Sequence, residues 1–129
     1  MIQFIIPLEI PSQNVTEKGK SWRGRYAKTK ARRHEWHGFC TWGMHQVGLP
    51  KATGHRSIKL IAYRKRCCYD IANLIGGAKA CVDGMVDAGL LTDDRDSKAH
   101  ISYEQFNLKD SPTGLPCTVV QVLSDTTKE

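Results

Sequence analysis

Apolar residues recur along this chain with two different periods, and the change of period separates predicted strands from predicted helices. Alternation of apolar and polar residues, as in SIKLIAYR at Ser57–Arg64, is typical of a half-buried strand. Three other β-prone segments are also predicted strands: Ile2–Ile10, His100–Leu108 and Thr118–Leu123. Pro7 interrupts the first of these, so that strand either ends there or lies at the edge of the sheet.

Two segments instead carry apolar residues at intervals of three and four, which predicts helices with one buried stripe each. The first helix is predicted to begin at Thr29, as its cap, and to end before Gly48 and Pro50. Its stripe is Trp36, Phe39, Cys40, Gly43, Met44 and Val47. The second helix is predicted over Asn73–Ala88 and ends at Gly89. Its stripe is Leu74, Ala78, Cys81, Val82 and Met85, widened by Ile75, Val86 and Ala88.

These elements, in a chain of 129 residues, predict one α+β domain spanning residues 1–129. Its sheet is predicted to be mixed and largely antiparallel, with about four to five strands beside two main helices. There are no internal repeats and no sign of a second core.

The charges divide the chain into a basic front half and an acidic rear half. Residues 1–66 hold 14 Lys and Arg against 3 Asp and Glu, a net +11, whereas residues 67–129 hold 5 against 10, a net −5. A half this basic is typical of proteins that bind nucleic acid or another anionic surface. The alternative is that these charges form solvated surface and nothing more.

Neither the apolar runs nor the cysteines suggest a membrane or secreted protein. No run approaches the roughly 18 to 20 apolar residues of a membrane helix, and MIQFIIPLEI lacks the basic start and the cleavage site of a signal peptide. The five cysteines are odd in number and show no CxxC spacing, which favours reduced, buried thiols: Cys40, Cys67, Cys68, Cys81 and Cys117. We therefore expect a cytoplasmic protein without a membrane partner.

Eight basic residues lie in an acid-free segment, which we call the basic segment: Lys18, Lys20, Arg23, Arg25, Lys28, Lys30, Arg32 and Arg33. Trp22 and Tyr26 are interleaved among them. Cations attract phosphates and aromatic faces stack on unpaired bases, so the mixture favours binding to DNA or RNA. The alternative is a basic loop whose two aromatics pack into the core. A second basic cluster, predicted to hold the DNA backbone as well, consists of Arg64, Lys65 and Arg66.

The first helix also allows a zinc site as a competing interpretation. His34, His37 and Cys40 are spaced so that one helical face can carry all three. No second ligand pair follows at zinc-site spacing, and Cys40 belongs to the predicted core stripe. Structural histidines are therefore the favoured interpretation.

Carboxylates and a single lysine mark the stretch Tyr69–Asp96, YDIANLIGGAKACVDGMVDAGLLTDDRD. Asp70 lies where a strand gives way to a helix and can cap that helix, unless Asn73 does so. Lys79 is four residues before Asp83 and can form an ordinary helical ion pair with it. Each of these residues therefore has a purely structural interpretation.

The adjacent carboxylates of Asp93 and Asp94 close the loop after this helix. Adjacent carboxylates repel each other unless a cation or basic neighbours offset the repulsion. Arg95 and Lys98 can do so without any metal. Taken one at a time, these residues too require no function.

The combination, however, resembles the RusA family of Holliday junction resolvases, many of them encoded by prophages. The family pattern reads D-x-D-N-L, then a lysine in the helix, an aspartate four residues later, and an A-G-x-x-x-D-D turn. The matching residues here are Asp70, Asn73, Leu74, Lys79, Asp83, Ala88, Gly89, Asp93 and Asp94. They span 25 of the 129 residues, and a weaker match extends through the basic segment towards the amino terminus.

The resemblance implies a homodimeric, metal-dependent endodeoxyribonuclease that cuts four-way DNA junctions. Asp70 and Asp94, with Asp93 in reserve, would bind Mg²⁺ or Mn²⁺, and a metal-bound water would hydrolyse the phosphodiester. Lys79 would stabilise the extra negative charge of the transition state. The residues with supporting roles would be Asn73 and Asp83.

One departure from the family pattern concerns the metal site. The second aspartate of the D-x-D pair is Ala72 in this chain. Mg²⁺ commonly keeps several waters and takes one or two protein carboxylates, so Asp70 and Asp94 meet the minimum. A natural variant site, an engineered inactive form and a protein that binds without cutting all stay open.

The implied site also sets a geometric condition. A helix over Asn73–Ala88 is about 24 Å long, and the following loop to Asp94 spans about 20 Å when fully extended. Either that loop folds back along the helix, or Asp94 meets Asp70 of the partner subunit.

Three functions follow from these patterns. The first is a structure-selective endonuclease that resolves four-way junctions. The second is a catalytically impaired protein that binds junctions or other nucleic acid, with Ala72 marking the lost chemistry. The third is a zinc-dependent protein that uses His34, His37 and a cysteine.

Overall fold

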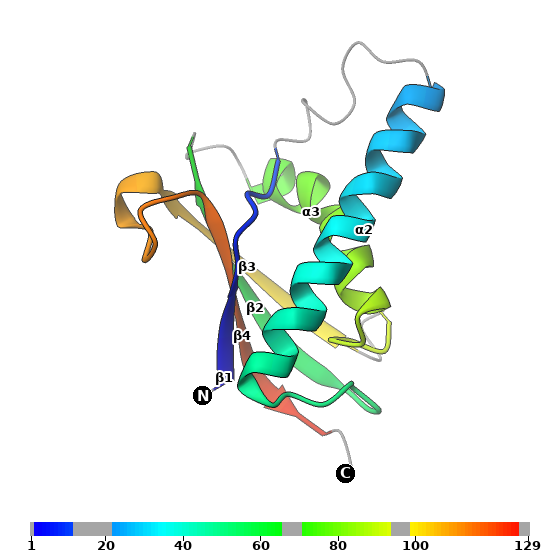
Figure 1. Ribbon diagram of the computed structural model, residues 1–129. Coiled ribbons are helices and arrows are strands. Elements are labelled where there is room, and N and C mark those ends of the chain that lie inside the picture. Colours follow the sequence, from blue (N-terminus) through cyan, green and yellow to red (C-terminus); the bar gives the residue numbers. More distant parts are fainter. Residues whose placement is uncertain (1, 12–21, 66–70, 94–98, 127–129) are drawn as a thin grey trace.

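The computed structural model describes residues 2–11, 22–65, 71–93 and 99–126, with the backbone alone for residues 22–26. The elements in chain order are β1 (Ile2–Ile6), α2 (Trp22–Val47), β2 (Arg56–Arg64), α3 (Ile71–Asp87), β3 (Ala99–Asn107), the short 3-10 helix η1 (Leu108–Asp110) and β4 (Cys117–Asp125). Two helices and a four-stranded mixed sheet in these residues confirm the predicted small α+β domain (Figure 1).

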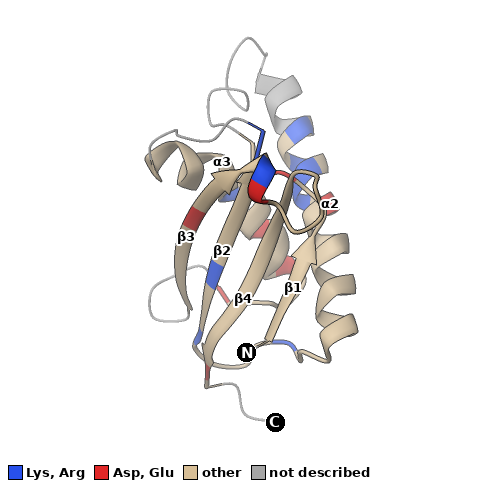
Figure 2. Cartoon of the chain, turned by 90° about the vertical axis from the view of Figure 1, so that its left-hand side faces the viewer, with Lys and Arg blue, Asp and Glu red and all other residues tan. Residues whose placement is uncertain are grey.

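The sheet has the strand order β1-β4-β2-β3. β4 pairs antiparallel with β1 on one side and with β2 on the other, whereas β2 and β3 are parallel. A parallel pair needs a crossover between its strands, and α3 provides it. β1 lies at one edge, as Pro7 predicted, and both helices pack against the same face of the sheet (Figures 1 and 2).

The alternating pattern of β2 identifies the face of the sheet that the helices cover. Ile58, Leu60 and Ala62 are fully buried and point into the core between sheet and helices. Arg56 and Arg64 have the same parity in the strand, so they also point inward and are buried. Strand β2, which supplies the centre of the core, thus has a buried arginine at each of its two ends.

The first helix differs from the prediction at its amino end and along its stripe. α2 begins at Trp22, so Thr29 lies inside the helix and does not cap it. Arginine, lysine and alanine, which dominate residues 22–33, are good helix formers and extend the helix through most of the basic segment. Phe39 and Val47, predicted to be buried, are each more than a third exposed.

The second helix follows its predicted stripe more closely. Leu74, Ala78, Cys81 and Met85 are fully buried, but Ile75 is 45% exposed. Ile75 lies outside the buried stripe and lines a surface groove between α3 and β3. Both helices end at a glycine with positive φ, as predicted: Gly48 at 70° and Gly89 at 89°.

Two glycines are required where elements approach closely. A Cβ on Gly43 of α2 would lie 2.3 Å from the ring of Phe4 in β1, and a Cβ on Gly84 of α3 would lie 2.4 Å from the backbone oxygen of Arg33 in α2. Gly38 is different, since a Cβ there would meet nothing within 4 Å. The low helix propensity of glycine therefore has a packing reason at two of these three positions.

Replacing Gly84 with alanine is expected to lower the free energy of unfolding by about 1–3 kcal/mol, because the new methyl group overlaps backbone that cannot rotate away. Gly38→Ala is the matched control and should raise it by about 0.5–1 kcal/mol, since it improves helix propensity without a clash. Urea denaturation, followed by the fluorescence of buried Trp36, measures both. A Gly84→Ala protein as stable as wild type would contradict the close helix contact.

Among the described residues, no helix is long and apolar enough to cross a membrane. Three of the five cysteines lie in this part of the chain, and all three are free and buried: Cys40, Cys81 and Cys117. Burial raises the pKa of the Cys40 and Cys81 thiols to about 12, so neither is a thiolate at neutral pH.

Candidate functional site

Two of the residues singled out by the family resemblance, Lys79 and Asp83, share an outward stripe of α3 with Ala72, the position that departs from the family pattern. Ala72, Gly76, Lys79 and Asp83 are spaced by three and four residues, which places them in one row along the helix. Ala72 and Lys79 are exposed, and Asp83 is half-buried. Leu74, by contrast, belongs to the core with no exposed surface. The pattern D-x-D-N-L therefore mixes positions on the surface with one in the core.

Lys79 lies beside a groove between α3 and the edge strand β3. The groove is lined by Ile75, Gly76, Lys79, Val82, Ile101 and Tyr103. No ion pair joins Lys79 to Asp83 or to another carboxylate among the residues that the structure describes. The ordinary helical pair that the spacing allows is thus not formed there, and the ammonium group is available to a phosphate placed in this groove.

The two principal carboxylates of the implied metal site, Asp70 and Asp94, lie outside the described residues. Of their described neighbours, Ile71 is the first residue of α3, whose 17 residues span about 25 Å, and Asp93 follows the last residue of that helix, Asp87, by six positions. Asp93 is half-buried. In the described ranges no three His, Cys, Asp or Glu side chains come together in a way that could hold a metal. The fit of Mg²⁺ or Mn²⁺ therefore depends on Asp70 and Asp94.

Arg64 was predicted to contact the DNA backbone, but it is buried in the structure. Its side chain is 3% exposed, and its guanidinium donates to the carbonyl oxygen of Ile10 at 3.2 Å and to Oε1 of Gln105 at 3.1 Å. A third bond, at 3.4 Å, reaches Oδ1 of Asn73. Asn73 is not the cap of α3, because it lies inside the helix with its side chain turned towards Arg64. These two residues tie the start of α3 to the sheet.

Several cations of the described structure lie close together on the amino-terminal part of α2 (Figure 2). Lys28, Lys30 and Arg33 are exposed there, and Arg32 is half-buried. Lys65, at the end of β2, is exposed as well, and its backbone N–H donates to Glu9 at 2.6 Å. The other predicted DNA-binding residues have no described side chain: Lys18, Lys20, Arg23, Arg25 and Arg66.

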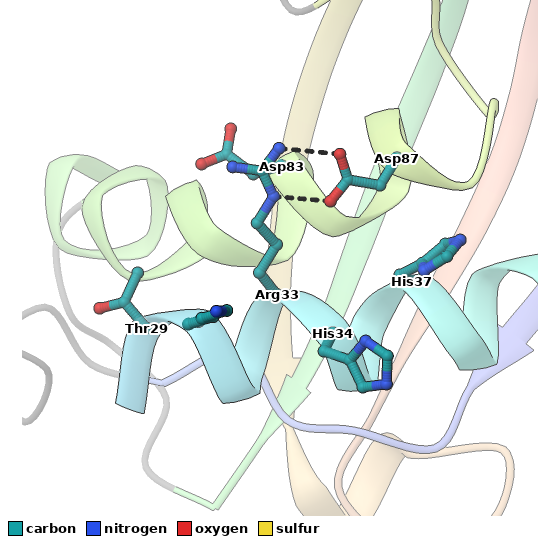
Figure 3. Close-up of a pocket in the computed structure, with 7 residues that line it drawn as sticks. Thr29, Arg33, His34, His37, Asp83 and Asp87 are labelled. Atoms are coloured by element: carbon teal, nitrogen blue, oxygen red, sulfur yellow. Dashed lines mark hydrogen bonds and ion pairs between the residues drawn. The ribbon is translucent and has the colours of Figure 1, made fainter. Parts of the chain in front are cut away.

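A polar cleft separates this basic part of α2 from α3 (Figure 3). Arg33 crosses it and donates two hydrogen bonds to Asp87, from Nε to Oδ2 at 2.6 Å and from Nη2 to Oδ1 at 2.8 Å. These bonds lower the pKa of Asp87, and Asp87 in turn raises the pKa of Arg33, with a smaller contribution from Asp83. Arg33 therefore contributes to helix packing as well as to the basic surface.

The histidines of the zinc interpretation lie along the same cleft. His34 and His37 are one turn apart on α2, with ring centroids 6.3 Å apart and an edge-to-face orientation. Cys40 is buried in the core with a raised pKa, so its thiol is neither exposed nor ionised. The three side chains do not form a common ligand set in the described structure.

Two features of the described structure have a local signal in the sequence. The parity of Arg56 and Arg64 with the apolar positions of β2 indicated that both point inward. The exposed aromatic Trp42 lies outside the apolar stripe of α2 and so was a surface position from the start. The pairing of Arg33 with Asp87 across 54 residues had no local signal.

No protein-family model, no curated protein and no solved structure matches the chain.

Proposed function

We propose that this chain is a metal-dependent endodeoxyribonuclease that cuts four-way DNA junctions as a homodimer. The observation that carries the proposal is the position of Lys79, exposed beside a groove and without an ion-pair partner in the described structure, on the same stripe of α3 as Ala72 and Asp83. A lysine in this setting can accept a phosphate as its counterion. The resemblance to the RusA family supplies the class of reaction.

The roles of the individual residues follow from their charge and exposure. Lys30 and Arg33 on α2, with Lys65 at the end of β2, attract the DNA backbone without reading its sequence. Lys79 stabilises the negative charge that develops on the phosphate during hydrolysis. A Mg²⁺ or Mn²⁺ ion, held by Asp70 and Asp94, would supply a water of lowered pKa.

A site shared between two subunits is consistent with the length of α3. Of the described neighbours of the two proposed ligands, Ile71 begins this helix and Asp93 follows its last residue, Asp87, by six positions. Pairing of Asp94 with Asp70 of the partner subunit avoids folding the loop back along α3. Mixed dimers of Asp70→Asn and Asp94→Asn chains should then regain cleavage that each parent lacks, and absence of rescue would exclude a shared site.

The proposal is tested by cleavage of a synthetic four-way junction in Mg²⁺ or Mn²⁺. Wild type is expected to introduce paired nicks, Asp94→Asn to bind without cutting, and Ala72→Asp to cut at least as fast as wild type because it adds a carboxylate on the stripe of Lys79. Affinity should fall steeply with salt, since binding releases counterions. Binding that is insensitive to salt would contradict the role given to the basic surface.

Ala72 favours a second candidate, a protein that binds junctions without cutting them. Its methyl group is exposed on α3 where the family pattern has a carboxylate. This candidate predicts equal junction binding in EDTA and in Mg²⁺, with no nicking in either. If Ala72→Asp alone cuts, the chain is a disabled resolvase; if no variant cuts, the binding function is the correct one.

A further inference from the structure

Gly38 is a glycine in the middle of α2 that the fold itself does not require. A Cβ at this position would meet nothing within 4 Å, and the backbone there is helical. Gly43 and Gly84, in contrast, make room for Phe4 and for the backbone of Arg33. Glycine weakens a helix relative to alanine, and a remaining use for one on an open helix surface is the close approach of another molecule.

Gly38 lies in a shallow groove with an aromatic wall. The groove is lined by Pro7, His34, Glu35, Gly38, Phe39 and Trp42. His34 and Trp42 each lie one helical turn from Gly38, so the missing side chain leaves a slot between them. Trp42 is 57% exposed and Phe39 is 36% exposed, which leaves two aromatic faces available at the slot.

The charges beside the groove indicate what kind of ligand fits it. His34 lines this groove and also the polar cleft that contains Lys30. In that cleft Arg33 is paired with Asp87 of α3 and Asp83 is a further carboxylate, so among the described residues Lys30 is its unpaired cation. From Ala27 to Val47, α2 carries four Lys and Arg residues, all at its amino-terminal end, and one acid, Glu35. The surface thus offers aromatic faces at one end and cations at the other, which complements a flat apolar ring joined to an anion.

We propose that this groove binds one unpaired base of a nucleic-acid strand. The base stacks on Trp42 or Phe39 above Gly38, and its phosphate lies towards His34 and Lys30. Base–aromatic stacking tolerates any sequence, because every base has a π-face. Glu35 repels phosphate and can accept a hydrogen bond from an exocyclic amino group, so it orients the nucleotide with its phosphate towards the cations.

A second copy of the chain fits this surface less well, because the surface is small. At the roughly 250 Å² that a fully buried aromatic side chain contributes, the exposed fractions of Phe39 and Trp42 amount to on the order of 200 Å². A standard interface between proteins buries about 800 Å² per partner. The groove therefore matches the size of a single base rather than that of a dimer contact.

The test compares a single-stranded oligonucleotide of about 12 nucleotides with the same strand carrying abasic sites, using fluorescence anisotropy. Trp42→Ala removes the stacking face, and Gly38→Gln fills the slot at a position where the fold has free space. Ala31→Gln, on exposed α2 surface outside the groove, is the matched control. Thermal denaturation checks that all variants remain folded.

Both groove variants are expected to bind the intact strand about tenfold or more weakly than wild type, with Ala31→Gln unchanged. The abasic strand should bind all four proteins alike. Intact-strand affinities within twofold of wild type, or no binding by wild type, would overturn the proposal. So would a dimer that Trp42→Ala separates in sedimentation without a change in strand binding, because a second copy would then occupy the groove.

This inference rests on the proposed function in one respect, the binding of nucleic acid. The experiments distinguish an incorrect groove proposal from an incorrect nuclease proposal. If junctions are cut but the groove variants bind the intact strand normally, the groove proposal falls and the nuclease stands. If no junction is cut but both groove variants lose binding to the intact strand, the nuclease falls and the groove stands.

Discussion

Replacing Lys79 with methionine is expected to slow junction cleavage by about 100- to 1000-fold, while junction binding changes little. Removing one electrostatic donor from a transition state typically has an effect of this size. Methionine keeps the aliphatic length of a side chain that lines the groove together with Ile75 and Val82, so the change removes charge rather than shape. Single-turnover cleavage at saturating enzyme measures the rate separately from affinity.

The control for this prediction is an exposed lysine of the described structure that does not line the groove. Lys109 of η1 meets both conditions, and Lys109→Met should cut at the wild-type rate. Stability should also be unaffected by Lys79→Met, because the side chain is exposed and forms no described ion pair. A cleavage rate within about threefold of wild type would show that Lys79 has no part in the reaction.

The fold was predictable because its signals are local. Residues 57–64 alternate between apolar and polar, and the apolar residues after Asn73 recur every three or four positions. Each pattern shows which side of its own strand or helix faces the core, so it can be recognised within that segment alone. The start of α2 was missed because the helix was predicted to begin at a capping threonine, although the arginine, lysine and alanine residues before it favour a helix. Thr29 therefore appeared to be a cap and lies inside the helix.

The site was predictable only in part, because its contacts join distant segments. The spacing of Ala72, Lys79 and Asp83 gives one stripe on any helix, and the structure places them so. The bonds from Arg64 to Ile10 and Asn73 depend on how the segments after β1 and β2 pack, and no local pattern contains that information. A basic cluster in sequence was thus interpreted as one surface, whereas Arg64 is buried and Lys65 is exposed.

Arg56 is the other buried arginine of β2, and Arg56→Met is expected to lower the free energy of unfolding by about 3 kcal/mol or more. The side chain has no exposed surface. Nη1 donates to the carbonyl oxygen of Leu90 at 2.9 Å, and Nη2 donates to that of Pro50 at 3.0 Å and to Oδ2 of Asp125 at 2.9 Å. Methionine fills much of the volume but leaves two backbone carbonyls without these donors.

These three bonds hold the segments that follow α2 and α3, together with the end of β4, against the start of β2. Leu90 is three residues before Asp93, so the same bonds also fix the chain that leads to the proposed closing carboxylates. Arg56→Met should therefore reduce junction cleavage even at temperatures where the protein stays folded.

The substitution Asp125→Asn tests the ion pair of Arg56 separately from the hydrogen bonds that Arg56 donates to the backbone. The Asp125 side chain is 27% exposed, so asparagine can still accept a hydrogen bond or be hydrated, and both carbonyl bonds of Arg56 remain. Its effect on unfolding should be smaller than that of Arg56→Met, as measured by urea denaturation of both proteins at the same pH. Equal losses would show that the ion pair, rather than the bonds to Leu90 and Pro50, is what Arg56 contributes. If Arg56→Met lowered the free energy of unfolding by less than about 1 kcal/mol, the segments that follow α2 and α3 would pack against β2 without these hydrogen bonds.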